Sequence, residues 1–129
     1  MLNLKNDNDF EEQLRIQILN EEINKISEQL KNIEIKKQEL RIILDTINEL
    51  KNTERNKDIL LPIGSGVFVN GQINNVKNLL VSVGSNIVVK KEVSDVEKMI
   101  NNELNNLLKV ENDLNNTLND LLIQLNNLR

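Results

Sequence analysis

Apolar residues recur every three or four positions over the first part of the chain, from about residue 9 to residue 53. The apolar members of this series are Ile16, Leu19, Ile23, Ile26, Leu30, Ile33, Leu40, Leu44 and Ile47. Two apolar positions in each group of seven residues are the pattern of a coiled-coil helix. Lys37 alone interrupts the series, and Ile35, Ile42 and Ile43 are expected to widen the apolar stripe.

A second series of the same kind runs from about residue 94 to residue 129. Its apolar positions are Ile100, Leu104, Leu107, Leu114, Leu118, Leu121, Leu125 and Leu128, and only Glu111 interrupts it. Ser94 and Glu97 have the spacing of a capping box, in which each side chain satisfies a free backbone amide at the start of a helix. The sequence therefore predicts a second coiled-coil helix.

The segment between the two series, residues 59–91, has the composition of short strands. The single Pro and all four Gly lie between residues 62 and 84, among runs of Val, Ile and Leu. Turn signals occur at residues 64–66, 70–71 and 84–86, and the Asn70–Gly71 pair is the strongest of these signals for a hairpin. Two β-hairpins are predicted, with Pro62 at a strand edge or start.

These elements combine into one domain over residues 1–129, of the α+β class and mainly α. Two long helices fold back on each other as an antiparallel coiled-coil hairpin, and the two β-hairpins are inserted between them. Aligning Lys51 with about Glu97 makes the numbers of facing residues add up to roughly 148. Lys37 then faces Glu111, so the only polar residues of the two apolar series form a pair that sets the register.

The same pairing leaves the residues before about 18 without a partner on the second helix. Phe10, Leu14 and Ile16 are therefore expected to be exposed or loosely packed. Exposed apolar side chains can bind other apolar chains weakly and without sequence preference. Ordinary fraying of a chain terminus is the competing interpretation.

Two hairpins of thin aliphatic strands are not expected to be stable alone in water. Their unpaired edges must be closed by strands of other subunits, because open edges promote aggregation. The insert is thus predicted to mediate assembly, through Leu61, Ile63, Val67, Phe68, Val69, Leu80, Val81, Val83, Ile87, Val88 and Val89.

Composition excludes several classes of function. The 129 residues include no His or Cys, so a zinc cluster, a disulfide framework and a thiol nucleophile are excluded. Ser65 lacks a base partner, and no catalytic, cofactor or metal site is expected. With 16 basic and 20 acidic residues, the chain is not expected to bind nucleic acid. No targeting or membrane segment is evident, so a cytoplasmic protein is expected.

Residues 60–71 (LLPIGSGVFVNG) and 80–89 (LVSVGSNIVV) resemble the central segment of the archaeal alpha type of the prefoldin family. The two flanking helices fit the same family. The resemblance implies an ATP-independent co-chaperone in which two alpha-type and four beta-type subunits join their hairpins into a double β-barrel. It also implies that the helix tips hold unfolded or nascent polypeptides and deliver them to a group II chaperonin. The tip residues here are Leu4, Phe10, Leu14, Ile18, Leu122, Leu125 and Leu128.

Two alternatives remain open from the sequence. A homo-oligomeric scaffold or filament subunit would close the same strand edges with copies of itself. An enzyme regulator or tether that uses only the coiled coil would not need residues 59–91 at all.

Overall fold

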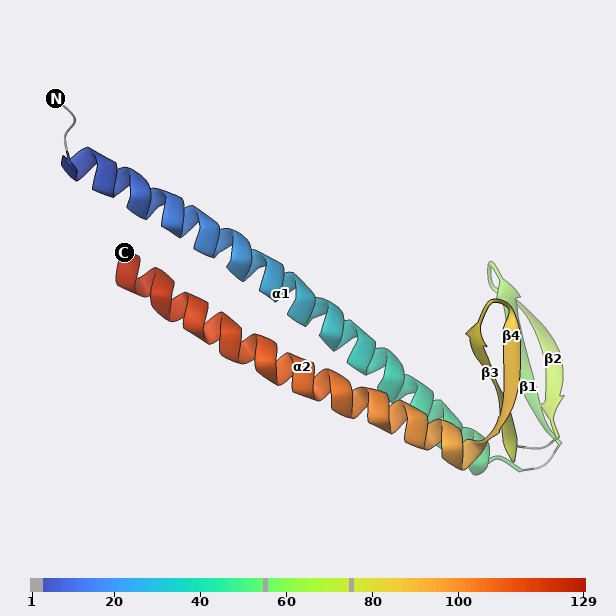
Figure 1. Ribbon diagram of the computed structural model, residues 1–129. Coiled ribbons are helices and arrows are strands. Elements are labelled where there is room, and N and C mark those ends of the chain that lie inside the picture. The colour runs from blue at the N-terminus through green and yellow to red at the C-terminus, as the bar shows by residue number, and fades with distance from the viewer. Residues whose placement is uncertain (1–3, 55, 75) are drawn as a thin grey trace. The chain divides into compact units, whose positions relative to one another are not determined.

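The computed structural model describes residues 4–54, 56–74 and 76–129, and the side chains from Asp7 onward. Its elements are α1 (Leu4–Lys51), β1 (Lys57–Gly64), β2 (Val67–Ile73), β3 (Asn78–Gly84), β4 (Ile87–Glu92) and α2 (Val93–Leu128) (Figure 1). Two long helices packed as a hairpin, with two β-hairpins between them in the chain, confirm the predicted fold class. The chain divides into two compact units, residues 1–38 with 104–129 and residues 39–103.

The apolar series of the two helices form the seam along which the helices pack. Every predicted seam position is buried or half-buried, including Lys37 and Glu111. In the first unit, Leu19, Leu121 and Leu125 form a buried cluster. The half-buried residues packed against this cluster are Ile16, Ile23, Ile26 and Leu128. The expectation that Ile16 is loosely packed was therefore wrong, because the seam extends one turn further than the predicted pairing allowed.

Three isoleucines of α1 do not belong to the seam. Ile35, Ile42 and Ile43 are exposed, so the prediction that they widen the buried stripe was wrong. Ile35 and Ile42 are seven residues apart and lie five residues after Leu30 and Lys37, respectively. In a heptad repeat that position faces away from the partner helix, so these side chains remain in contact with solvent.

The strands form two separate two-stranded antiparallel sheets, β1 with β2 and β3 with β4. Ser65 and Gly66 have positive φ angles of 49° and 78°, and Ser85 and Asn86 have positive φ angles of 51° and 61°. Two consecutive residues with positive φ are typical of the tight turns that match the twist of antiparallel strands. Both hairpins therefore turn at a two-residue loop whose second residue is Gly or Asn.

The strongest turn signal in the sequence lies inside a strand. Asn70 pairs with Leu60 and Gly71 pairs with Ile59, so the prediction of a turn at Asn70–Gly71 was wrong. A Cβ atom on Gly71 would lie 3.1 Å from Cδ1 of Leu61. The glycine therefore leaves room for a neighbouring leucine instead of turning the chain.

The second helix begins at Val93, directly after β4 and one residue before the predicted cap Ser94. The backbone N–H of Val93 donates to the carbonyl of Lys77 at 3.1 Å, which joins the start of α2 to the start of β3. The Glu97 carboxylate accepts a hydrogen bond from Lys51 Nζ at 3.0 Å. Glu97 thus contacts the pairing partner that the sequence assigned to it, instead of completing a capping box.

Candidate functional site

The two β-hairpins carry an unusual amount of exposed apolar surface, here called the hairpin surface. Its exposed members are Leu60, Leu61, Ile63, Val67, Phe68, Val69, Leu80, Val83, Ile87, Val88 and Val89. Leu80 is 74% exposed and Phe68 is 56% exposed, although such side chains are normally buried. Of the residues predicted to mediate assembly, only Val81 is half-buried. Leu60 was missed, although it belongs to the same apolar run.

Both faces of each hairpin are apolar close to its turn. Leu61 pairs with Val69, and the next pair along the strands, Pro62 with Phe68, lies on the opposite face. In the second hairpin Val81 pairs with Val89, and Val88 opposite Ser82 lies on the other face. An antiparallel sheet with one face in water usually shows alternating apolar and polar residues, and neither hairpin shows a clean alternation close to its turn.

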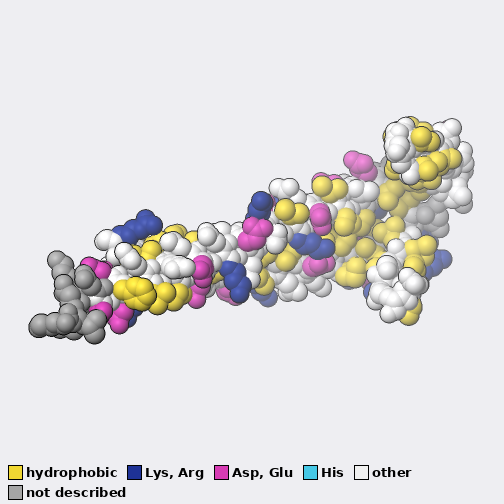
Figure 2. All heavy atoms as spheres, turned by 90° about the horizontal axis from the view of Figure 1, so that it is seen from above, with side chains coloured by type: hydrophobic (Ala, Val, Ile, Leu, Met, Phe, Trp, Pro, Cys, Tyr) yellow, Lys and Arg dark blue, Asp and Glu magenta, His cyan; other side chains and the backbone are white. Residues whose placement is uncertain are grey.

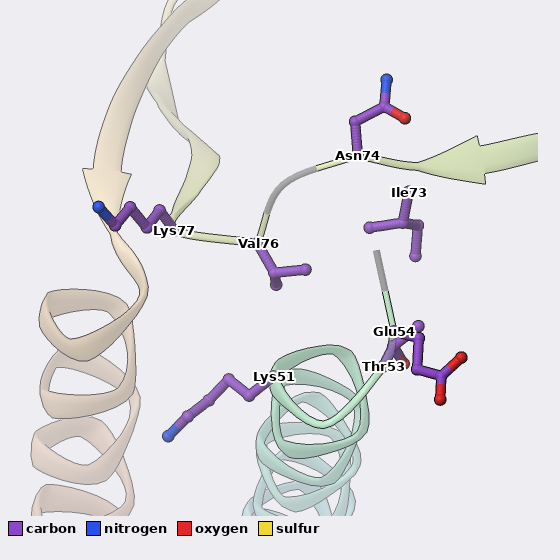
Figure 3. A pocket seen from close by; sticks show the side chains of 7 residues that line it. All are labelled: Lys51, Thr53, Glu54, Ile73, Asn74, Val76 and Lys77. Carbon is purple, nitrogen blue, oxygen red and sulfur yellow. The ribbon is translucent and has the colours of Figure 1, made fainter. Parts of the chain in front are cut away.

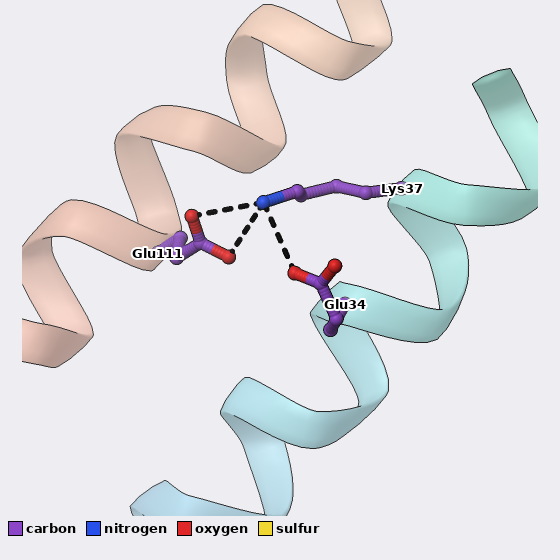
Figure 4. Close-up of polar contacts among 3 residues, drawn as sticks. All are labelled: Glu34, Lys37 and Glu111. Carbon is purple, nitrogen blue, oxygen red and sulfur yellow. Dashed lines mark hydrogen bonds and ion pairs between the residues drawn. The ribbon is translucent and has the colours of Figure 1, made fainter.

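A charged cluster lies in the apolar seam of the first unit (Figure 4). Lys37 Nζ donates to both carboxylate oxygens of Glu111, at 3.0 and 2.9 Å, and lies 3.2 Å from the carboxylate of Glu34. Hydrogen bonds from Lys37 to Glu111, and then to Glu34, raise the pKa of the Lys37 amine although burial opposes this shift. The sequence suggested Lys37 and Glu111; Glu34, three residues before Lys37 on the same helix, could have been found from its spacing.

The residues predicted to contact clients fall into two groups. Phe10, Leu14, Ile18 and Leu122 are exposed. Leu125 is only 6% exposed in the cluster with Leu19 and Leu121, and Leu128 is half-buried against that cluster. The packed helices therefore do not place Leu125 on a client surface. The side chain of Leu4 lies outside the described residues.

An open hollow of about 530 Å³ lies between the end of α1 and the segment that joins the two hairpins. Figure 3 shows Lys51, Glu54, Ile73, Val76 and Lys77 among its lining side chains. Its amines and its single carboxylate lack a nucleophile paired with a general base. Among the described residues, no group of three or more acidic side chains could hold a metal ion. No described helix is long and apolar enough to cross a membrane.

Comparison with known proteins identifies the relatives of this chain. The family model "Prefoldin subunit" matches residues 19–129. A prefoldin subunit alpha of Methanococcus maripaludis (strain C5) is 36% identical over 62 residues, which are 48% of this chain and 41% of that protein. The same subunit of Methanococcus aeolicus is 33% identical over 58 residues, which are 45% of this chain and 38% of that protein. The matched stretches thus span about two-fifths of these relatives.

A solved structure has the same fold. A chain from the cryo-EM structure of filamentous PFD from Methanocaldococcus jannaschii superposes with a TM-score of 0.77, covering 90% of this chain and 96% of that one. The two sequences are 24% identical, so this likeness concerns the fold alone. The family match covers α1 from residue 19 onward, both hairpins and α2. The chain belongs to the prefoldin family.

Proposed function

We propose that this chain is an alpha-type prefoldin subunit that works as an ATP-independent holdase. The observation that carries the proposal is the hairpin surface, which is apolar on both faces of both hairpins and exposed in the single chain. Burying one large aliphatic or aromatic side chain contributes about 1.5–3 kcal/mol. Eleven exposed side chains of this kind favour assembly strongly.

In the proposed assembly, two copies of this chain and four beta-type subunits join their hairpins into a double β-barrel. Closure removes the open strand edges and covers the apolar faces together. The ends of the helices then bind unfolded or nascent polypeptides and pass them to a group II chaperonin in the cytoplasm. Weak apolar contacts at several helix ends become strong when they engage one polypeptide together. This work requires no nucleotide, cofactor or metal.

A homo-oligomeric scaffold or filament subunit is the second candidate function. One observation favours it: the solved structure with the same fold comes from a filamentous assembly. Copies of this chain can close the strand edges and cover the apolar faces of the hairpins, as a beta-type partner would.

Native mass spectrometry of this chain, alone and mixed with a beta-type subunit from the same genome, tests the two candidates. A hexamer with two copies of this chain supports the holdase assembly. It must also suppress the aggregation of a denatured client protein. A large homo-oligomer whose mass does not change when the beta-type subunit is added contradicts the holdase proposal and favours the scaffold.

A further inference from the structure

The N-terminal part of α1 carries an apolar stripe that no other described residue covers. Phe10, Leu14 and Ile18 are spaced four residues apart, so they follow one face of the helix. Phe10 is 66% exposed, and every described side chain from Asp7 to Arg15 is exposed. The second helix ends at Leu128, which packs against the cluster around Leu19.

This stripe is not a continuation of the seam. The heptad positions that precede Ile16 are occupied by Asp9 and Glu12, so the seam stops there. Phe10 and Leu14 lie on the other side of the helix. Beside Ile18, an open hollow of about 520 Å³ is lined also by Leu19, Leu128 and two side chains of opposite charge, Arg15 and Glu22. The stripe thus leads into a concave surface at the end of the first unit.

Carboxylates surround the stripe. Asp7 and Glu11 are three residues before Phe10 and Leu14, and Glu21 and Glu22 are three and four residues after Ile18, so all four are helix neighbours of the stripe. Arg15 and Lys25 are the only basic residues between residues 7 and 25, against six acidic residues, and Arg15, three residues before Ile18, is also a helix neighbour of the stripe. Figure 2 shows acidic, basic and hydrophobic side chains together at this end of the described chain.

These carboxylates are available to a partner. Within the described part of the chain, the salt bridges of acidic residues involve Glu34, Glu97 and Glu111, and none involves Asp7, Glu11, Glu21 or Glu22. Acidic residues near a helix N-terminus stabilise the helix dipole, but this effect fades after the first turn. Asp7 alone of the four lies in that turn. The dipole therefore does not account for the other three.

We propose that the surface formed by Phe10, Leu14, Ile18 and the flanking carboxylates selects unfolded segments whose apolar residues are flanked by Lys or Arg. This inference rests on the holdase function proposed above and names its substrate class. The apolar stripe supplies affinity without regard to sequence. The four carboxylates attract neighbouring cations and repel acidic flanks, so charge decides which apolar segments bind.

Fluorescence anisotropy with three labelled peptides tests this selection on the full chain, assembled with its beta-type partner. The peptides share one Leu/Val/Phe core and carry Lys/Arg, Ser/Gln or Asp/Glu flanks. Exposed charge pairs contribute about 0.2–1 kcal/mol each, so the basic peptide should bind about fivefold more tightly than the acidic one at low salt. This preference should shrink at 0.5 M salt, because dissolved ions then limit the interaction between exposed charges to distances of about 4 Å.

Two matched double variants show whether the stripe itself selects. Asp7→Asn with Glu11→Gln removes two carboxylates beside the stripe, and Asp9→Asn with Glu12→Gln removes two on the other side of the same segment. The first variant removes two of the four carboxylates, so the preference should fall from about fivefold to about twofold while the affinity for the neutral peptide stays the same. The second variant should keep both the preference and the affinity.

Other outcomes overturn the inference. If both variants lose the preference equally, overall charge and not this surface is responsible. If all three peptides bind the original chain equally while client aggregation is suppressed, the charge selection is wrong and the holdase function stands. If no peptide binds and aggregation is not suppressed, the holdase function fails as well.

Discussion

Lys37 and Glu111 face each other across the seam of the helical hairpin, with 2.9 Å between Lys37 Nζ and the nearer carboxylate oxygen of Glu111. They are 74 residues apart in the chain. Each is the only polar residue in its apolar series. An antiparallel register shifted by one heptad would place each charge opposite an aliphatic residue. The pair therefore disfavours shifted registers, as single polar residues do in other coiled coils.

Replacing one member of this pair should destabilise the helical hairpin less than reversing its charge. Lys37→Leu leaves Glu111, which is only half-buried, able to contact water. Lys37→Glu places three carboxylates together at Glu34, Glu111 and position 37. Thermal unfolding of Lys37→Leu, Glu111→Leu, the double variant and Lys37→Glu measures the order of stabilities. A double-mutant cycle without coupling between residues 37 and 111 would mean that the register is different.

The same amine makes stability depend on pH in the alkaline range. Glu111 and Glu34 raise the pKa of Lys37 above its ordinary value of 10.5. The folded state therefore holds this proton more tightly than the unfolded state does, so its stabilisation is complete below pH 10.5 and is lost as the pH rises through the folded-state pKa. The melting temperature of the original chain should fall more between pH 9 and pH 12 than that of Lys37→Met. Equal decreases contradict the prediction.

Polar substitutions on the hairpin surface should weaken assembly. Phe68→Ser and Leu80→Ser each remove an exposed apolar side chain from a hairpin. If these side chains are buried between subunits, each change costs about 1.5–3 kcal/mol at every copy of the interface. Native mass spectrometry at decreasing protein concentration measures the loss of the oligomer. The matched control is Leu108→Ser on α2, which is also exposed and should leave the mass unchanged.

A comparison of the two hairpin turns predicts which substitutions at position 66 reduce stability least. Gly66 has a φ of 78°, and Asn86, the corresponding residue of the second turn, has a φ of 61°. Gly66→Ala should cost about 1–2 kcal/mol, since a Cβ atom is unfavourable at positive φ. Gly66→Asn should cost less, because asparagine tolerates this conformation. Chemical denaturation of the assembled protein compares the two variants, and equal losses of stability would contradict the assigned turn.

Two neighbouring leucines of α2, Leu122 and Leu125, should contribute very differently to the free energy of unfolding. Leu125→Ala should cost about 2–5 kcal/mol, because it leaves a cavity in the cluster with Leu19 and Leu121. Leu122→Ala, at a position that is 40% exposed, should change stability by about 0.5 kcal/mol or less. Urea unfolding measures both values. A large effect of Leu122→Ala on client binding, without a loss of stability, would support its proposed place in the client surface.

Most of the architecture could be read from local pattern. The heptad repeats predict both helices and their seam, because a period of three or four residues places side chains on one helix face whatever the rest of the chain does. The facing of Lys37 and Glu111 also follows, since the two interruptions of the repeats must meet in an antiparallel pair. The residues of the hairpin strands could also be predicted, because short runs of β-branched residues favour strands.

The helices, their seam and the existence of two β-hairpins follow from the sequence pattern alone. The strand register, which places Asn70 and Gly71 inside β2, became clear only from the folded structure. The folded structure also shows that Leu125, which the sequence placed both in the seam and among the tip residues, is buried. Periodicity is a local property, whereas strand register and side-chain cover depend on which distant residues pair. Which residues pair depends on how the side chains of both segments pack together, so neither segment specifies the pairing alone.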